Sequence, residues 1–376
     1  MRVAIDCSGI SIGGGATYLH SLLFALAEID QENEYIIILF AQSQPDWTAK
    51  LPQNFQFIEI PLRTDNSGRR VWWIHTKLHK LIRKYQIDVL YSPNDQTSFF
   101  VSCPVVLGIQ NIAPYADLRT SGYIKSKVRL LLLRQLTRVS TWKASKVLFV
   151  SNNSKEFISE RLGISNEKGI AVHHGLSRQF DPDIQASLRF KQYQPYILSV
   201  STIYYHKNYI SLIRGFSKLL KEYGLQYNLV IAGRTVHAGY LARMKSIIAD
   251  EGISSNVHMI GEVEYSQIPE LYAAARLFAF PSYLETFGLP AAEAMASGVP
   301  VVTSDATVMP EICGDAALYF DPFDTDKLAE EMHKLLTNDS LWEQMRCRGL
   351  ERTREFSWIK TAQKTLDILK SAEAES

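Results

Sequence analysis

Cysteine is scarce in this chain, and the cysteines that occur are not spaced for a shared metal ion. Four of them are scattered over 376 residues, without a Cys-x-x-Cys pair. Isolated cysteines of this kind are typical of small buried residues in a reducing compartment. Their positions are Cys7, Cys103, Cys313 and Cys347.

A long apolar run is also missing. The most apolar short stretch, residues 130–133, is flanked by Arg129, Arg134 and Arg138, whereas a membrane-spanning helix needs about 20 apolar residues. The first residues lead directly into a strand-like run, so we expect no signal peptide. A cytoplasmic protein is expected.

Acidic residues are absent from Leu118 to Lys155, a stretch that holds nine basic residues. A second basic stretch, residues 69–84, contains Trp72 and Trp73. Basic helices with aromatic residues suit an anionic membrane surface, and an ordinary solvated helix face with one tryptophan in the core is the alternative. We expect peripheral contact with the inner face of a membrane through the N-terminal domain. Neither stretch carries a nucleic-acid-binding module, so no nucleic-acid partner is expected.

The length suits two domains, and apolar strand-like runs alternate with helix-length segments, which favours an α/β fold with parallel sheets. We expect domains at 1–185 and 192–355 and a closing helix within 356–376. In the first domain, strands are expected at 3–5, 35–40, 57–60, 89–91, 105–109 and 147–150, and helices at 17–27, 74–85, 124–143 and 155–162. In the second, strands are expected at 196–200, 227–232, 258–260, 277–280 and 300–303, and helices at 210–221, 240–250, 267–274, 289–296 and 326–336.

Two glutamates eight residues apart, Glu285 and Glu293, flank a Phe-Gly-Leu-Pro turn between an apolar strand and a helix. Chance alone yields pairs at this spacing, and the pairs Glu262/Glu270 and Glu343/Glu351 lack the strand–loop–helix–strand context. A loop that presents a carboxylate and leads into a helix N-terminus suits an anionic, hydroxyl-rich ligand such as a sugar nucleotide.

The segment 280–302, together with residues 309–322, resembles the E-x7-E region of family 4 retaining glycosyltransferases of the GT-B fold. The resemblance implies two Rossmann-like domains whose parallel sheets face an interdomain cleft, with a C-terminal helix that crosses back to the first domain. It also implies a hexosyltransferase that moves a sugar, with retention, from a UDP- or GDP-sugar to an acceptor hydroxyl. Synthesis of a cell-surface polysaccharide or glycoconjugate, with a saccharide or lipid-linked glycan as acceptor, is expected.

The resemblance assigns most of the donor site to the second domain. Glu285 would act at the donor sugar, Glu293 would accept hydrogen bonds from the ribose, and Lys207 matches the diphosphate-binding lysine. Where the family commonly has further basic residues, this chain has Thr202 and His206. The other expected donor-binding residues are Ser201, Thr202, Gly233, Arg234, Val263, Thr286, Phe287, Gly288 and Leu289.

The first domain departs from the family pattern. A glycine loop with Gly14 and Gly15 resembles the loop that closes over the donor, although Tyr18 replaces the third glycine of a dinucleotide fingerprint. Gln110 and Asn111 stand where the family often has a His-Asp pair. Neither can act as a general base, but both can hold hydroxyl groups, so we include them among the catalytic residues.

No catalytic metal and no cofactor are expected, because the two Asp-x-Asp sequences do not follow donor-binding strands. Asp181-Pro182-Asp183 lies in the expected linker, and Asp324-Thr325-Asp326 is placed to cap a helix. A sugar-nucleotide epimerase or phosphorylase of the same fold, an NAD(P)-dependent oxidoreductase and a non-catalytic partner subunit remain alternatives.

Overall fold

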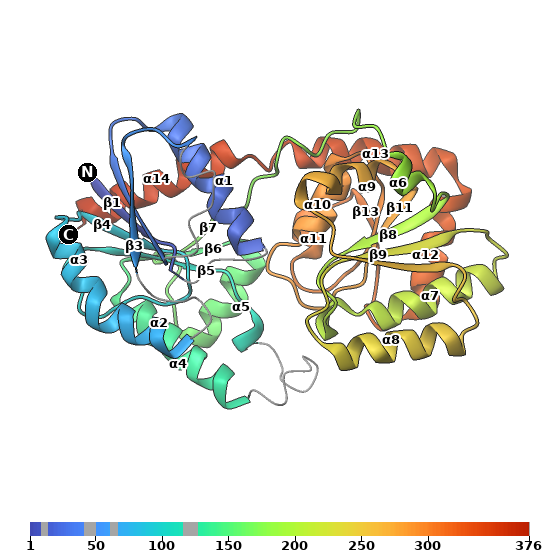
Figure 1. Ribbon diagram of the computed structural model, residues 1–376, viewed down its shortest axis with the longest axis horizontal. Coiled ribbons are helices and arrows are strands. Elements are labelled where there is room, and N and C mark those ends of the chain that lie inside the picture. Colours follow the sequence, from blue (N-terminus) through green and yellow to red (C-terminus); the bar gives the residue numbers. More distant parts are fainter. Residues whose placement is uncertain (9–13, 41–49, 61–66, 116–126, 376) are drawn as a thin grey trace. The chain divides into compact units, whose positions relative to one another are not determined.

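The computed structural model describes residues 1–8, 14–40, 50–60, 67–115 and 127–375, and it divides into two compact units. Unit 1 contains the described residues up to Gly175 together with those from Phe356 onward, and unit 2 runs from Leu176 to Glu355. Each unit has its own parallel sheet and its own core (Figure 1).

The sheet of unit 1 has seven parallel strands in the order β3-β2-β1-β4-β5-β6-β7. Most of its strands are short, apolar and buried, as expected where helices cover both faces of a parallel sheet, whereas the edge strand β3 exposes Gln56 and Glu59. Their bounds are β1 Arg2–Asp6, β2 Glu34–Phe40, β3 Phe55–Ile60, β4 Val89–Ser92, β5 Val105–Ile109, β6 Lys146–Phe149 and β7 Gly169–Ala171.

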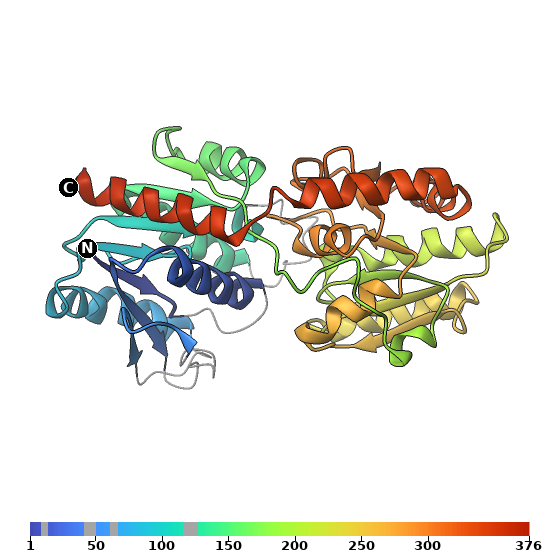
Figure 2. The ribbon, with the colours of Figure 1, turned by 90° about the horizontal axis from the view of Figure 1, so that it is seen from above.

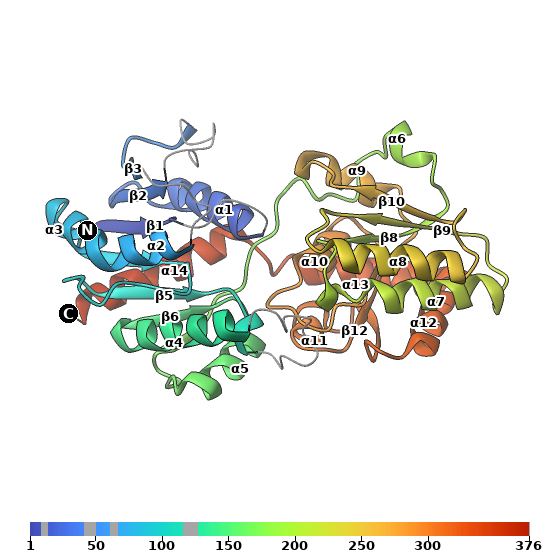
Figure 3. The same cartoon turned by 60° about the horizontal axis from the view of Figure 1, so that its bottom comes forward.

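Two layers of helices cover this sheet. On one face, α1 (Gly14–Ile29) lies beside α14 (Trp358–Ala374), as Figure 2 shows, and both helices share a core cluster with β1 and β2. The other face carries α2 (Ser67–Trp73), the π-helical turn η2 (Ile74–Leu78), α3 (His79–Lys84), α4 (Lys127–Lys143) and α5 (Asn152–Leu162) (Figure 3). A 3-10 turn, η3, covers Ala113–Tyr115.

The sheet of unit 2 has six parallel strands in the order β10-β9-β8-β11-β12-β13. Buried residues of α7, α8 and α12 form one core cluster with the strands. The strands are β8 Tyr196–Val200, β9 Asn228–Ala232, β10 Val257–Gly261, β11 Leu277–Phe280, β12 Val301–Ser304 and β13 Ala317–Phe320. The helices are α6 Leu188–Lys191, α7 Tyr209–Lys221, α8 Ala238–Asp250, α9 Ile268–Ala273, α10 Leu289–Ala296, α11 Met309–Cys313, α12 Thr325–Thr337 and α13 Asp339–Thr353, with 3-10 turns η5 Tyr205–Lys207 and η6 Tyr265–Gln267.

The division between the units, after Gly175, lies ten residues before the expected end of the first domain at residue 185. Residues after Leu176 already pack on unit 2, since the Phe180 ring lies 5.7 Å from that of Tyr265 and 5.9 Å from that of Tyr272. Further along, Gln194 Nε2 donates to the Ala274 carbonyl (3.0 Å). The proline-containing segment after Leu176, which has no apolar periodicity, is therefore held on unit 2 by a few aromatic contacts and a hydrogen bond.

Both sheets reverse their strand order once, between β1 and β4 in unit 1 and between β8 and β11 in unit 2. In doubly wound α/β sheets, ligands bind beyond the carboxyl ends of the strands at such a switch point. The loops after these four strands are therefore where a site is expected. Of the described helices, none is long and apolar enough to cross a bilayer.

Candidate active site

The loop with the two glutamates connects the carboxyl end of β11 to α10. Gly288 caps α10 in the left-handed conformation (φ 83°), and a Cβ atom there would lie 2.7 Å from Met309 Sδ. The backbone angle therefore favours glycine at this position, and a larger residue would also have to displace the Met309 side chain. Pro290 occupies the first turn of α10, where a missing N–H leaves no hydrogen bond unmade.

Lys207 and Glu285, assigned from the sequence to diphosphate and sugar, form an ion pair at the switch point of unit 2. Lys207 Nζ lies 2.5 Å from Glu285 Oε1, and the two side chains are only 12% and 11% exposed. Lys207 ends the turn after β8, and Glu285 lies on the loop after β11. The strand order therefore brings together two charges that are 78 residues apart in the chain.

His206 fastens these two loops to each other. Its carbonyl accepts hydrogen bonds from the Tyr283 amide and from Ser282 Oγ, both at 3.0 Å. Burial, together with the neighbouring Lys207 charge, lowers the pKa of the His206 ring to about 4, although the Glu285 charge acts in the opposite direction. The ring is therefore neutral at pH 7, and its Nδ1 is buried without a hydrogen-bond partner.

Thr307 also holds the glutamate loop, which the sequence did not indicate. Its Oγ1 accepts a hydrogen bond from the Glu285 amide (3.2 Å), and its backbone is left-handed (φ 53°). A β-branched residue rarely adopts this conformation, so surrounding contacts must maintain it. The amino-acid sequence does not show which residues other than glycine adopt a positive φ, so this role of Thr307 could not be predicted.

Glu293 lies apart from this ion pair, in a buried environment made by two tyrosines. Its Oε1 accepts from Tyr265 Oη (3.1 Å), and its Oε2 lies 3.4 Å from Tyr272 Oη, whose proton is shared with the closer Pro290 carbonyl (2.9 Å). Burial raises the pKa of Glu293 to about 8, although both tyrosine hydrogen bonds act in the opposite direction. The two glutamates of the motif therefore differ in environment. Sequence reasoning did not find the tyrosines, because they follow a different strand.

Gly233 allows the ends of β8 and β9 to approach each other closely. A Cβ atom at Gly233 would lie 1.8 Å from the Ser201 carbonyl oxygen, and its φ is 149°. Its N–H donates to the Gly261 carbonyl (2.7 Å), while the Ser201 carbonyl accepts from Tyr209 Oη (2.9 Å). These strand ends form a fixed backbone support, beside which Thr202 and Arg234 are exposed and Val263 is half-buried.

In unit 1, Gln110 and Asn111 form the turn that follows β5. Both of their amides donate to Asp95 Oδ1, at 2.8 and 3.4 Å, and Asn111 Oδ1 accepts from the Ala113 amide (3.0 Å). The sequence did not single out Asp95. Gly14 and Gly15 lie in the first turn of α1, and residues 9–13 of the glycine loop lie outside the described residues.

The two Asp-x-Asp sequences are engaged in local turns. Asp181 Oδ1 accepts from the Asp183 amide (2.8 Å), and Asp324 caps α12, as predicted, by accepting from the amides of Asp326 and Lys327. Among the described residues, no group of three or more His, Cys, Asp or Glu side chains is arranged to hold a metal ion.

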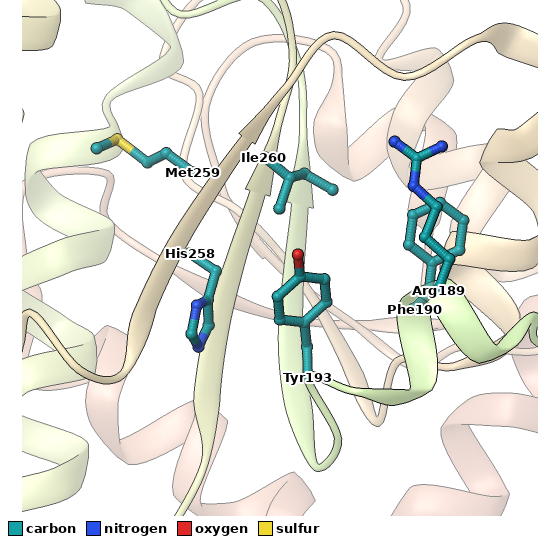
Figure 4. A pocket seen from close by; sticks show the side chains of 6 residues that line it. All are labelled: Arg189, Phe190, Tyr193, His258, Met259 and Ile260. Atoms are coloured by element: carbon teal, nitrogen blue, oxygen red, sulfur yellow. The ribbon is translucent and has the colours of Figure 1, made fainter.

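A separate pocket of about 360 Å³ lies on unit 2 between α6 and β10. Figure 4 shows Tyr193 and His258 side by side in it, with ring centroids 4.9 Å apart. Arg189 Nη1 donates to Gln267 Oε1 (3.0 Å). None of the residues assigned from the sequence lines this pocket; Phe190, Met259 and Ile260 complete its wall.

Two parallel sheets of this strand order are the architecture of the GT-B fold. A sucrose-phosphate synthase from Thermosynechococcus elongatus superimposes with a TM-score of 0.78 and 16% identity, over 100% of both chains. The model of the glycosyl transferases group 1 matches residues 180–352, and that of glycosyltransferase family 4 matches residues 12–180. The chain belongs to the family 4 glycosyltransferases, as the E-x7-E region indicated.

Curated relatives match the chain over part of its length. An O-antigen chain mannosyltransferase B from Escherichia coli is 35% identical over 179 residues, which are 47% of this chain and 46% of the relative. The O-antigen chain mannosyltransferase RfbU from Salmonella typhimurium is 31% identical over 209 residues, 55% of this chain and 56% of the relative. The chain thus spans about half the length of these curated relatives.

Proposed function

We propose that this protein is a retaining, metal-independent mannosyltransferase that uses a UDP- or GDP-activated sugar to extend a cell-surface polysaccharide. The observation that carries the proposal is the Lys207–Glu285 pair, 2.5 Å apart at the switch point of unit 2. Family membership supports sugar transfer, and the O-antigen relatives, whose names specify mannosyl transfer, support mannose as the sugar.

In this proposal, unit 2 binds the donor. Lys207 pairs with the diphosphate, and the start of α10 near Thr286, Phe287 and Leu289 adds the positive end of a helix dipole. Because the His206 ring is neutral at pH 7, Lys207 supplies the full cationic charge of this turn. When the donor binds, the Glu285 side chain leaves Lys207 and contacts the sugar. Glu293 then accepts hydrogen bonds from the ribose hydroxyls instead of from the tyrosine hydroxyls.

The same groups support metal independence, and we propose retention from the family resemblance. When the bond from the sugar to the diphosphate breaks, Lys207 and the helix dipole stabilise the negative charge that develops on the leaving group. The leaving phosphate takes the proton of the acceptor hydroxyl, which attacks from the same face. Gln110 and Asn111 in unit 1 hold the acceptor hydroxyl without acting as bases.

We further propose that the acceptor is carried at a membrane. Trp72, Phe100, Leu131, Leu132 and Trp142 of unit 1 are each more than half exposed. We call these five residues, which lie on α2, on α4 and between β4 and β5, the five exposed apolar residues.

Cations lie close to two of the five exposed apolar residues. Lys77 Nζ lies 5.7 Å from the Trp72 ring, and the Arg138 guanidinium lies 6.0 Å from the Trp142 ring. Neither of the two helical segments that carry these pairs has an acidic residue. Exposed aromatic residues with adjacent cations suit anionic lipid headgroups, which supports a lipid-linked acceptor at the inner face of a membrane. Trp73, by contrast, is buried in the core.

The test is slow hydrolysis of a panel of UDP-, GDP- and other nucleotide sugars by the full chain, with and without EDTA. We expect a mannose nucleotide to be hydrolysed faster than the others and EDTA to have no effect. NMR of the freshly released sugar, or of the product with a saccharide acceptor, should show the donor's anomeric configuration. Loss of activity with EDTA would refute metal independence, and an inverted product would refute retention.

A further inference from the structure

Asp95 joins the loops that follow two neighbouring strands of unit 1. It lies three residues beyond β4, is partly buried, and has a left-handed backbone (φ 61°). Its Oδ1 accepts the amides of Gln110 (2.8 Å) and Asn111 (3.4 Å), which follow β5. One carboxylate oxygen therefore binds the first two N–H groups of the turn whose side chains are expected to hold the acceptor.

The backbone around Asp95 is fixed from the other side as well. Its own N–H donates to the Gly108 carbonyl (3.0 Å). A Cβ atom at Gly108 would lie 2.9 Å from Pro93 Cα, so strand β5 and the loop after β4 approach as closely as a glycine permits. Asp95 thus cannot shift without moving the turn after β5.

Hydrogen bonds from Arg70 and Asn94 hold the loop that carries Asp95. Arg70 Nη2 donates to the Asn94 carbonyl (3.3 Å), and Asn94 Nδ2 donates to the carbonyls of Asp6 and Ser8. The positive charge of Arg70 acts on the carboxyls of both Asp6 and Asp95. Among the described residues, the Asp95 charge also contributes to the raised pKa of Tyr115, from the 3-10 turn η3, for which burial is the main cause.

We propose that Asp95 is a positioning residue, which sets the Gln110–Asn111 turn so that these two side chains hold the acceptor hydroxyl. An ionised carboxylate suits this role because hydrogen bonds to a charged acceptor are stronger than those between neutral groups. The inference rests on the proposed function for the identity of what the turn holds. The contact between Asp95 and the turn can be tested without it.

Asp95→Asn is the variant of choice, since asparagine tolerates a left-handed backbone and retains one acceptor oxygen without the charge. The matched control is Asp88→Asn at the amino end of the same strand, where Asp88 Oδ2 accepts the Arg2 amide (2.6 Å). Amide hydrogen exchange of the full chain reports the turn directly. We expect the Gln110 and Asn111 amides to exchange roughly 10-fold faster in Asp95→Asn and at the wild-type rate in Asp88→Asn.

The kinetic readout addresses the acceptor role. We expect Asp95→Asn to raise the acceptor KM roughly 10-fold while leaving donor hydrolysis unchanged. Burial raises the pKa of Asp95 to about 6, so wild-type kcat/KM for the acceptor should fall as pH drops through about 6, and the variant should lack this decline.

The outcomes separate the two proposals. Unchanged exchange at Gln110 and Asn111 in the variant would overturn the positioning role, whatever the activity of the protein. Faster exchange with an unaltered acceptor KM and pH profile would overturn the acceptor role of the turn. If the wild type transfers no sugar from any donor, the proposed function fails, and the exchange measurement still decides whether Asp95 positions the turn.

Discussion

At the scale of single residues, Glu285 and Glu293 share a motif but have different electrostatic partners. Glu285 is neutralised by Lys207, whereas Glu293 has two tyrosine hydroxyls and no cation among the partners that shift its pKa. The difference arises because α10 places Glu293 inside unit 2, while Glu285 remains on the loop before the helix. We therefore expect the two glutamates to respond differently to the same substitution.

Glu285→Gln should lower the rate of sugar transfer by roughly 100- to 1000-fold, because a neutral amide cannot supply the charge that stabilises the transition state. Nucleotide affinity should be retained, since Lys207 no longer has a carboxylate competing with the diphosphate. Transfer kinetics and calorimetric titration with UDP and GDP measure the two effects. Glu351→Gln on α13 is the control, because Glu351 belongs to another pair at the same spacing and is exposed. Turnover close to the wild-type rate would contradict the assignment of Glu285.

Glu293→Gln should change how stability depends on pH. Burial raises the pKa of Glu293 to about 8 in the folded state, from an ordinary value of 4.5. The folded protein therefore binds this proton more tightly than the unfolded chain, and stability is lost as pH rises from 4.5 through about 8. The loss is on the order of several kcal/mol, since each pKa unit corresponds to about 1.4 kcal/mol.

Glutamine at position 293 stays neutral and should avoid this loss. We expect the variant and the wild type to have similar Tm values at pH 5, and the variant to have the higher Tm at pH 9, as measured by calorimetry without nucleotide. Glu351→Gln should show no such divergence. If the Tm difference between Glu293→Gln and the wild type is the same at both pH values, Glu293 does not carry a raised pKa.

At the scale of helices and strands, α4 carries three of the five exposed apolar residues, and Arg138 lies close to the ring of one of them, Trp142. Replacing Leu131, Leu132 and Trp142 together with serine should weaken binding to vesicles that contain anionic lipid by at least about 10-fold, because the apolar contribution to membrane binding is lost. All three side chains are already exposed, so the fold should be spared.

The control for this experiment is Leu188→Ser in unit 2, which is 85% exposed and lies outside the basic segments. Co-sedimentation with phosphatidylserine vesicles at low and high salt gives the binding constants. Wild-type binding should weaken with salt, as expected for attraction between exposed cations and headgroups. Equal binding by the triple variant and the wild type would exclude α4 as the contact surface.

The sequence predicted the apolar strands well, because a strand buried on both faces of a parallel sheet is a short continuous apolar run bounded by turns. The strands β7 and β13 were not predicted; β7 has only three residues, and both are edge strands with half-buried residues, so neither is a continuous buried apolar run. The helical segment expected at 74–85 begins earlier, at Ser67. Its first residues were not predicted as helical because Arg69 and Arg70 interrupt the apolar periodicity there. Asp95 and Thr307 were missed because their roles depend on loops from different strands meeting at one sheet edge.

At the scale of the whole molecule, the chain folds as two units with separate cores. The last helix, α14, follows unit 2 in sequence but packs its buried face against unit 1. Along α14, Ala362, Leu366, Leu369 and Ala372 are buried at helical spacing against the cluster that contains α1. Beyond this face, Lys146 Nζ and Glu375 Oε1 form an ion pair (2.8 Å) between β6 and the chain end. The last residues of the chain thus stabilise the first unit rather than the unit that precedes them in sequence.

Leu369→Ala should therefore destabilise unit 1 and leave unit 2 unaffected. Removing a fully buried leucine side chain costs about 2–5 kcal/mol, which should lower the Tm of the unit 1 transition by roughly 5–15 °C. Calorimetry with and without the donor nucleotide identifies the transitions, because a ligand raises the Tm of the unit that binds it. The control is Lys370→Ala, the adjacent exposed position. A single transition shifted as a whole would show that the two units unfold together, and a shift confined to the nucleotide-sensitive transition would contradict the assignment of α14 to unit 1.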